Sequence, residues 1–340
     1  MSGERMRAEM LEQPEALARL VERFEEYVLT VRTVVRTPLA GVVFLARGSS
    51  DNAAVYGRYL AELASGRPAG LAAPSLHTLY DTRPHYAGFL VVAISQSGET
   101  PEIVTVCRRL RNAGARTVAI VNDAASPLAE AVDGVLAIDV GPELAVPATK
   151  TVTGQMLAAA AVAAAIGTAP FTTRQLAELP QAVEAVLADP EPASRLAAEW
   201  ADAARLFVVG RGLLYAAALE AALKIKETTG ILAEGISAAD LRHGPIGVAA
   251  GDVPVLALDG GGPAREDVLA VAELARERGA PVAICGDSAD AEMPLPGGVP
   301  EALAAFPATV RAQQLAVALA DARGLDADAP AGLTKVTPTQ

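Results

Sequence analysis

The sequence is organised around residues 90–100, which read Leu-Val-Val-Ala-Ile-Ser-Gln-Ser-Gly-Glu-Thr. The aliphatic first half of this stretch is typical of a β-strand that is buried on both faces. After the turn, apolar residues recur at helical spacing at Ile103, Val106 and Leu110, so the turn joins the end of a strand to the start of a helix. Because parallel α/β sheets bind their ligands at such turns, the sequence predicts a binding site here.

The composition of this turn favours an anionic ligand. Ser95 and Ser97 supply hydroxyl groups, and Gly98 allows a close approach of the backbone. The N-terminus of the following helix adds unpaired N–H groups, and together these groups favour an anion, most simply a phosphate. The alternative is that either serine only caps the helix and that the glycine only forms the turn.

The length and composition fit a two-domain α/β protein. The chain has 340 residues, of which 51% are hydrophobic, so it can bury substantial cores. Its formal net charge of -12 argues against nucleic acid or an anionic membrane surface as a partner. Cys107 and Cys285 fall in an expected helix and an expected buried strand without metal-ligand spacing, so we predict reduced core residues and no metal site.

Nothing in the sequence predicts export or membrane insertion. The opening residues, Met-Ser-Gly-Glu-Arg-Met-Arg-Ala-Glu, are too charged for a secretory signal. The longest apolar run, Met156 to Ile166, is too short to span a bilayer. We therefore expect a soluble cytoplasmic protein.

Strands and helices are expected to alternate along the first half of the chain. Apolar runs predict strands at residues 41–45, 89–94, 117–121 and 135–140, with helices at 53–64, 100–112 and 151–166. The opening segment, to about residue 36, has apolar residues at helical spacing and predicts one or two amphipathic helices. The alternation implies right-handed parallel crossovers and a doubly wound sheet.

The second half repeats the first in outline. Three pairs of segments match, namely 206–212 with 42–48, 253–262 with 90–98, and 279–287 with 114–123. The sequence therefore predicts an α/β fold of two tandem subdomains, each a doubly wound parallel sheet flanked by helices. We expect a helical segment at residues 1–35, subdomains at 36–170 and 171–325, and a tail at 326–340.

The two copies differ where a ligand would bind. Ser49 and Ser50 of the first copy are matched by Leu213 and Leu214, and the Ser-Gln-Ser turn is matched by Asp-Gly-Gly at residues 259–261. Since both hydroxyl clusters are absent from the second copy, we expect only the first to bind a phosphate.

A second group of polar residues lies in the second half. Lys224 and Glu227 are three residues apart and share a helix face, an arrangement that is usually a solvated ion pair. His243 lies in a turn bounded by Gly-Pro, a poor place for a packing residue, whereas His77 and His85 are expected to be structural. An amine, a carboxylate and an imidazole can open a sugar ring and move a proton between adjacent carbons without a cofactor.

These features together resemble the SIS (sugar isomerase) domain family, most closely the isomerase half of glutamine:fructose-6-phosphate aminotransferases. The likeness covers nearly the whole chain, from Glu-Met-Leu-Glu-Gln-Pro at residues 9–14, which resembles the interdomain linker of those enzymes, to the tail. Its specific motifs are the Ser-Gln-Ser-Gly-Glu-Thr turn, Thr149-Lys150, Ala-Leu-Lys-Ile-Lys-Glu at 222–227, His-Gly-Pro at 243–245, and Lys335. The resemblance implies a flavodoxin-like sheet in each subdomain.

The resemblance also implies how a sugar phosphate would be bound. The hydroxyl turns would hold the phosphate through Ser50, Ser95, Gln96, Ser97 and Thr100. Further contacts to the substrate would come from Gly48, Ser49, Val146 and Ala148. The substrate would be a hexose 6-phosphate or an amino-sugar 6-phosphate.

Four residues would carry the chemistry by the same resemblance. Glu227 would be the base that shuttles a proton between C1 and C2, and Lys224 would assist proton transfer at the amino-bearing carbon. His243 would open the ring, reaching across from the partner subunit of a homodimer. Lys335 would contact the open-chain sugar and form an imine with its carbonyl. An imine acidifies the neighbouring C–H, so these roles fit together.

The sequence also departs from that family. The aminotransferases begin with a glutaminase domain that has an N-terminal cysteine, and no such domain is present, so we expect that the chain does not take nitrogen from glutamine unaided. Ala148 stands where the family has a serine, which leaves the identity of the substrate open. Arg47 replaces a cysteine and either adds a charge to the site or has the same structural role as Arg211 in the second copy.

The sequence thus predicts an isomerising deaminase that converts glucosamine 6-phosphate to fructose 6-phosphate and ammonia, or runs the ammonia-dependent reverse. A related possibility is a deglycase that acts on a fructosyl amino acid 6-phosphate. A sugar-phosphate sensor without catalysis is the alternative from another class. The presence of all four catalytic candidates favours an enzyme, since a sensor needs only the phosphate turns.

Overall fold

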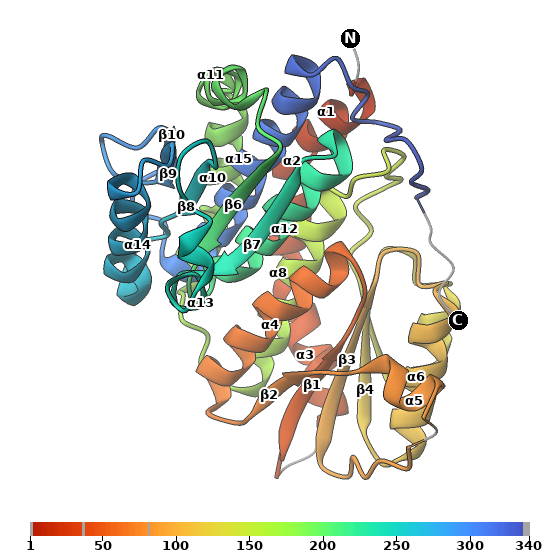
Figure 1. The fold of residues 1–340 in the computed structure, drawn as a ribbon. Coiled ribbons are helices and arrows are strands. Elements are labelled where there is room, and N and C mark those ends of the chain that lie inside the picture. The colour runs from red at the N-terminus through yellow and green to blue at the C-terminus, as the bar shows by residue number, and fades with distance from the viewer. Residues whose placement is uncertain (1–2, 36–37, 81, 336–340) are drawn as a thin grey trace. The chain divides into compact units, whose positions relative to one another are not determined.

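The computed structural model describes residues 3–35, 38–80 and 82–335 (Figure 1). These residues form two compact units. The first-sheet unit comprises Ala16–Pro142 and Thr151–Thr172, and the second-sheet unit comprises residues 3–15, Glu143–Lys150 and Thr173–Lys335. No helix within the described ranges is both long enough and apolar enough to cross a membrane.

The first-sheet unit contains a parallel sheet in the order β2-β1-β3-β4-β5. Its strands are β1 (Gly41–Leu45), β2 (Ala69–Leu71), β3 (Phe89–Ser95), β4 (Arg116–Val121) and β5 (Gly134–Ala137). This is the flavodoxin-like order, in which the chain leaves β1 and β3 toward opposite faces of the sheet. The gap between the ends of these two strands is therefore the topological switch point.

Helices cover both faces of this sheet. They are α2 (Gln13–Glu22), which begins in residues 3–15, α3 (Phe24–Val34), α4 (Ser49–Ser65), α5 (Pro74–Thr78), α6 (Pro101–Asn112), α7 (Pro127–Glu130) and α8 (Lys150–Ile166). On one face, Gly57 of α4 packs so closely on Phe44 that a Cβ atom would lie 2.6 Å from the ring. On the other face, Val91 and Ala93 of β3 share a core with Cys107 of α6.

The second-sheet unit has a parallel sheet in the order β10-β9-β8-β6-β7. Its strands are β6 (Arg205–Gly210), β7 (Leu232–Ser237), β8 (Val255–Leu258), β9 (Val282–Gly286) and β10 (Met293–Pro294). Read from the other edge, this is the same order as in the first sheet. The expected fold of two tandem doubly wound parallel sheets is confirmed.

The helices of this unit include the longest one in the described chain. They are α1 (Glu4–Leu11), α9 (Thr173–Ala177), α10 (Leu179–Leu187), α11 (Glu191–Trp200), α12 (Leu214–Thr229), α13 (Ala238–Arg242), α14 (Arg265–Glu277) and α15 (Glu301–Ala322), with short 3-10 turns η1 (Pro245–Gly247) and η2 (Gly262–Ala264). Most residues of α15 are buried, and it packs against α10, α11 and α12. The other face of the sheet is covered by α13 and α14.

Several elements differ from the expectations, each for a physical reason. The edge strands β2, β7 and β10 were not predicted, because they are short or half-exposed and lack a continuous apolar run. The N-terminal segment forms three helices rather than one or two, and α4 begins at Ser49 rather than near residue 53. Cys107 and Cys285 are core residues as expected, since both are free and buried, and burial raises the pKa of each thiol to about 12.

Candidate functional site

The first group of candidate residues lies at the switch point of the first sheet. Leu45 at the end of β1 pairs with Ala93 in β3, so the turns that follow the two strands are neighbours. The β1 turn leads into α4 at Ser49, and the β3 turn leads into α6 at Pro101. The structure therefore brings the candidate phosphate-binding residues of both turns to one edge of one sheet.

In the β3 turn, two serine hydroxyls accept hydrogen bonds from the backbone. Ser95 Oγ accepts one from the Gly98 N–H (3.1 Å), and Ser97 Oγ accepts one from the Glu99 N–H (3.2 Å). Gly98 has a φ of +64°, and a Cβ atom there would overlap the side chain of Ser126. Both serines help to hold the turn, and each hydroxyl can still donate its own hydrogen to a ligand.

The other candidate residues of this turn lie on either side of the serines. Gln96 is half-buried, and its carbonyl oxygen accepts the N–H of Asn122 (3.2 Å). Thr100 occupies the N-cap position of α6. The simpler explanation, that Ser95 or Ser97 caps this helix, is therefore wrong.

The β1 turn depends on a glycine for its backbone. Gly48 has a φ of +61° and a ψ of -137°, a conformation that is essentially restricted to glycine. A Cβ atom there would meet nothing within 4 Å, so the backbone rather than the space requires glycine. Ser49 and Ser50 follow in the first turn of α4, where Ser50 is buried. Their hydroxyls lie where the helix N-terminus favours an anion.

Arg47 and Arg211 hold equivalent positions in the two copies, and both form ion pairs. Arg47 Nε and Nη2 lie 2.9 and 3.1 Å from the two carboxylate oxygens of Glu102, at the start of α6. Arg211 Nε lies 3.2 Å from Asp267, at the start of α14. Because the second copy keeps the pair without the hydroxyl turns, we interpret Arg47 as a structural residue that ties the two turns together.

In the second sheet, side chains fill the space over the equivalent turns. A Cβ atom at Gly260 would overlap Leu214, and one at Gly262 would overlap the carboxylate of Glu301. The space left among these residues is too small for a water molecule. The second copy therefore has side chains packed on the glycines of this turn, where the first copy has serines.

The second group of candidate residues lies on α12 in the second-sheet unit. The Lys224 side chain is 1% exposed, and its ammonium group donates a hydrogen bond to Glu227. Glu220 lies about one turn earlier on the same face, with Oε1 3.5 Å from Lys224 Nζ. The usual interpretation of such a pair as a solvated surface pair therefore fails, because the amine is buried between two carboxylates.

The charge of Lys224 follows from these surroundings. Burial by itself lowers the pKa of an amine. The carboxylates of Glu220, Glu227 and Glu143 more than offset this effect and hold the pKa of Lys224 above its ordinary value of 10.5. Lys224 is therefore an ammonium ion near neutral pH, suited to donating a proton or stabilising negative charge rather than attacking as a neutral amine.

Lys335 pairs with a carboxylate that no sequence motif marks. Its Nζ lies 2.8 Å from Glu143 Oε2. The Glu143 side chain is 0% exposed, and its Oε1 accepts the N–H of Thr149 (2.8 Å). Since the charge of Glu143 also acts on Lys224, one carboxylate connects the two candidate lysines.

Glu143 and Glu220 are the members of this group that the sequence analysis missed. Glu220, Lys224 and Glu227 are spaced i, i+4 and i+7, so helical spacing alone could have placed them on one face. Glu143 lies in an irregular loop, where no periodic pattern marks a buried side chain. Only the tertiary structure reveals it.

The N-terminal helix α1 fixes the loop that carries Glu143. The carboxylate of Glu9 accepts hydrogen bonds from two successive backbone N–H groups of the loop. Burial raises the pKa of Glu9 above its ordinary value of 4.5, although these hydrogen bonds oppose the shift. At the end of the loop, the buried ammonium group of Lys150 pairs with Glu12.

The remaining candidates of the second-sheet unit lie outside these ion pairs. His243 is exposed just after α13, and its backbone N–H donates to the carbonyl oxygen of Asp240 (3.1 Å). No side chain in the described part of the chain forms a hydrogen bond or ion pair with its imidazole. Val146 and Ala148 are half-buried in the Glu143 loop. The structure thus groups Lys224, Glu227 and Lys335 but does not join His243 to them.

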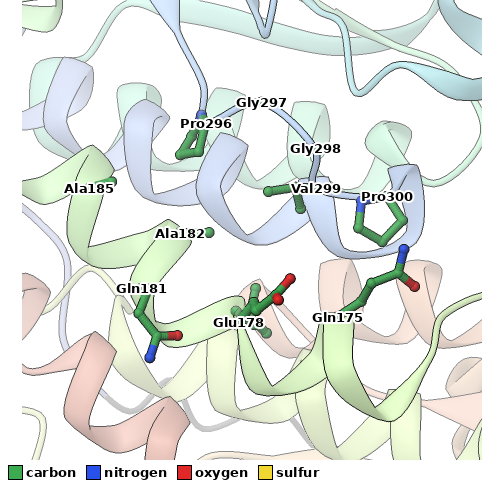
Figure 2. A pocket seen from close by; sticks show the side chains of 11 residues that line it. Gln175, Glu178, Gln181, Ala182, Ala185, Pro296, Gly297, Gly298, Val299 and Pro300 are labelled. Atoms are coloured by element: carbon green, nitrogen blue, oxygen red, sulfur yellow. The ribbon is translucent and has the colours of Figure 1, made fainter.

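A separate hollow of about 250 Å³ lies between the α9–α10 segment and residues 296–300 (Figure 2). Gln175 and Glu178 line it on the helical side, and none of the candidate residues takes part. Among the residues that the structure describes, no group of three or more His, Cys, Asp or Glu side chains could hold a metal ion.

Comparison with known families decides the relationship. The SIS domain model matches residues 41–165 and 199–293, segments that span nearly all of the two sheets. The chain belongs to the SIS domain family. This confirms the resemblance drawn from the motifs, and the duplicated SIS fold accounts for the repeated strand order.

The SIS relatives with curated names are larger proteins. A glutamine–fructose-6-phosphate aminotransferase (isomerizing) of Methanothermobacter thermautotrophicus is 33% identical over 97% of this chain and 56% of its own length. One of Thermococcus kodakarensis is 31% identical over 97% of this chain and 57% of its own length. This chain thus spans little more than half the length of these relatives.

Solved structures match over nearly the full length of this chain. A candidate phosphosugar isomerase from Silicibacter pomeroyi DSS-3 superposes with a TM-score of 0.85 and 34% identity, covering 96% of this chain and 100% of the other. A glucosamine-6-phosphate deaminase from Thermotoga maritima has a TM-score of 0.78 at 22% identity, covering 98% and 99%. At that identity the second match shows a shared fold.

Proposed function

We propose that this SIS protein is a sugar phosphate isomerase that converts glucosamine 6-phosphate to fructose 6-phosphate and ammonia, or runs the ammonia-dependent reverse. The observation that carries the proposal is the group of Lys224, Glu227, Glu143 and Lys335 within one unit. Aldose–ketose isomerisation uses a base and a proton donor to move hydrogen between adjacent carbons, and an amine that forms an imine acidifies the reacting C–H; this group supplies all three. Water then hydrolyses the imine at the amino-bearing carbon, which breaks the C–N bond and releases ammonia. The aminotransferase and phosphosugar isomerase names of its relatives support the same chemistry.

The serine turns of the first sheet are the proposed phosphate site. The phosphate ligands are Ser50, Ser95, Gln96, Ser97 and Thr100, with further substrate contacts from Gly48, Ser49, Val146 and Ala148. The net charge of -12 provides no general attraction for an anion, so binding depends on these local donors and the two helix N-termini. The absence of both hydroxyl clusters from the second copy supports one phosphate per chain.

Glu227 is the proposed base that moves the proton between C1 and C2. Its side chain is 22% exposed, whereas the Lys224 side chain is 1% exposed, so Glu227 is the member of the pair that a substrate can reach. The Lys224 ammonium group donates a hydrogen bond to Glu227 and can return a proton to the reacting carbon or nitrogen. A positioned base of this kind contributes about 10²–10⁴-fold to the rate.

His243 and Lys335 act before the proton transfer by Glu227. His243 opens the sugar ring from the partner subunit of a homodimer, which its exposed imidazole supports. Lys335 then forms an imine with the carbonyl of the open-chain sugar, which acidifies the neighbouring C–H for Glu227. No step of this sequence calls for a cofactor.

The test is turnover of glucosamine 6-phosphate by the purified full chain, followed by the release of ammonia and fructose 6-phosphate. The variant Glu227→Gln should lower kcat at least about 100-fold, because the amide cannot accept the proton. The control Glu234→Gln changes an exposed carboxylate on β7 and should leave kcat unchanged.

Two other results would overturn the proposal. Release of free amino acid from a fructosyl amino acid 6-phosphate, without turnover of glucosamine 6-phosphate, would identify a deglycase. Saturable binding of both compounds without turnover of either would identify a sensor.

A further inference from the structure

We propose that Glu143 is the base that activates Lys335 for imine formation. It takes a proton from the Lys335 ammonium group, so that the neutral amine can attack the carbonyl carbon of the open-chain sugar. This inference rests on the proposed function, which assigns the imine to Lys335, and adds a residue that no motif in the sequence marks.

The contacts of Glu143 fix its carboxylate for this task. One oxygen lies 2.8 Å from Lys335 Nζ, within reach of direct proton transfer. The other oxygen accepts the Thr149 N–H at 2.8 Å, and Glu9 holds two backbone N–H groups of the same loop. The carboxylate therefore keeps its orientation when Lys335 changes its charge and bonding.

The surroundings of the two lysines distinguish their roles. Lys224 is buried among Glu220, Glu227 and Glu143, which keep it protonated. The side chain of Lys335 is 24% exposed, so its amine can meet a substrate while one oxygen of Glu143 remains beside it. A lysine attacks a carbonyl only as the neutral amine. The buried Lys224 stays an ammonium ion between several carboxylates, whereas the more exposed Lys335, with the single carboxylate of Glu143 to accept its proton, is the nucleophile.

The step balances without any co-reactant. Proton transfer gives the Lys335 amine and the Glu143 carboxylic acid. A C–N bond then forms as the carbonyl π bond breaks, and the Glu143 proton passes to the sugar oxygen. That oxygen takes a second proton from the nitrogen and leaves as water, which gives the protonated imine. The overall change is ammonium plus carbonyl to iminium plus water, and Glu143 ends as a carboxylate.

Reductive trapping tests this step separately from turnover. The full chain is incubated with fructose 6-phosphate and cyanoborohydride, and mass spectrometry measures the rate at which the sugar adds to Lys335. We expect Glu143→Gln to trap about 100-fold more slowly than the wild type, with an unchanged Kd for fructose 6-phosphate. Glu12→Gln, which alters the other ion pair of this loop region, should trap at the wild-type rate.

Chemical rescue separates a base from a merely structural contact. Glu143→Ala leaves space beside Lys335, and added formate should restore trapping at least about tenfold, whereas chloride at the same ionic strength should not. Wild-type trapping by Glu143→Gln, or no response of Glu143→Ala to formate, would overturn the inference. Turnover of glucosamine 6-phosphate without any adduct on Lys335 would also overturn it, while leaving the deaminase activity in place.

Discussion

Replacing Gly98 with alanine tests the packing of the serine turn that we propose as part of the phosphate site. Two costs arise at this position. The φ of +64° is unfavourable for any L-residue with a side chain, by about 1–2 kcal/mol. The new methyl group would also overlap Ser126, and such overpacking costs about 1–3 kcal/mol. We therefore expect a total loss of about 2–5 kcal/mol.

Gly66, the residue that follows α4, is a matched control. It has nearly the same φ, +63°, and a Cβ atom there would meet nothing within 4 Å. Gly66→Ala should therefore cost only the backbone term of about 1–2 kcal/mol. The difference between the free-energy losses of the two variants measures the cost of the overlap with Ser126.

Hydrogen exchange of the β3 and β4 amides is the assay, because it reports the opening free energy of the first-sheet unit rather than of the whole chain. The double variant Gly98→Ala with Ser126→Gly should recover the overpacking part of the loss. Equal losses for Gly98→Ala and Gly66→Ala would refute the reasoning.

Three further predictions concern the ion pairs and the buried acid of α1. Lys224→Met removes the ammonium group beside the buried Glu220 and should lower the free energy of unfolding by about 3–5 kcal/mol; an unchanged urea midpoint would mean that the pair is solvated. Arg47→Lys should destabilise almost as much as Arg47→Ala, by about 1–3 kcal/mol, because lysine cannot make two parallel hydrogen bonds to Glu102; full stability of the lysine variant in thermal unfolding would contradict this. The raised pKa of Glu9 means that the folded chain binds this proton more tightly than the unfolded chain, so the contribution of Glu9 to stability is full below pH 4.5 and is lost as the pH rises through the folded pKa. Urea titrations above pH 4.5 should therefore show a weaker decline for Glu9→Gln than for the wild type, and parallel curves would exclude the effect.

The parts of the fold that could be predicted from the sequence are those that are buried on both sides. β3 shows a continuous aliphatic run because both of its faces are covered, and it is buried from Leu90 to Ser95. β7 lies at a sheet edge, where exposed Leu232 and Glu234 alternate with buried Ala233. Because the apolar Leu232 is exposed, the order of apolar and polar residues in β7 does not follow burial and does not predict a strand. Its pairing with β6 decides its structure.

The candidate site also has residues that could be predicted from the sequence and one that could not. The serine turns and the Lys224–Glu227 spacing could be found because small motifs and helical periodicity mark them. Glu143 is one acidic residue in a loop, among 40 Asp and Glu residues in the chain. Glu143 is distinguished by the burial of its carboxylate and by its ion pair with Lys335, which lies near the C-terminus. No local sequence pattern encodes either feature.

The path of the chain limits how this duplicated protein can be taken apart. Residues 3–15 and Glu143–Lys150 pack in the second-sheet unit, although one segment precedes the first-sheet unit and the other interrupts it. A fragment that began at residue 171 would carry Lys335 but neither Glu9 nor Glu143. Truncation of the gene to the second copy would therefore separate the tail lysine from its carboxylate.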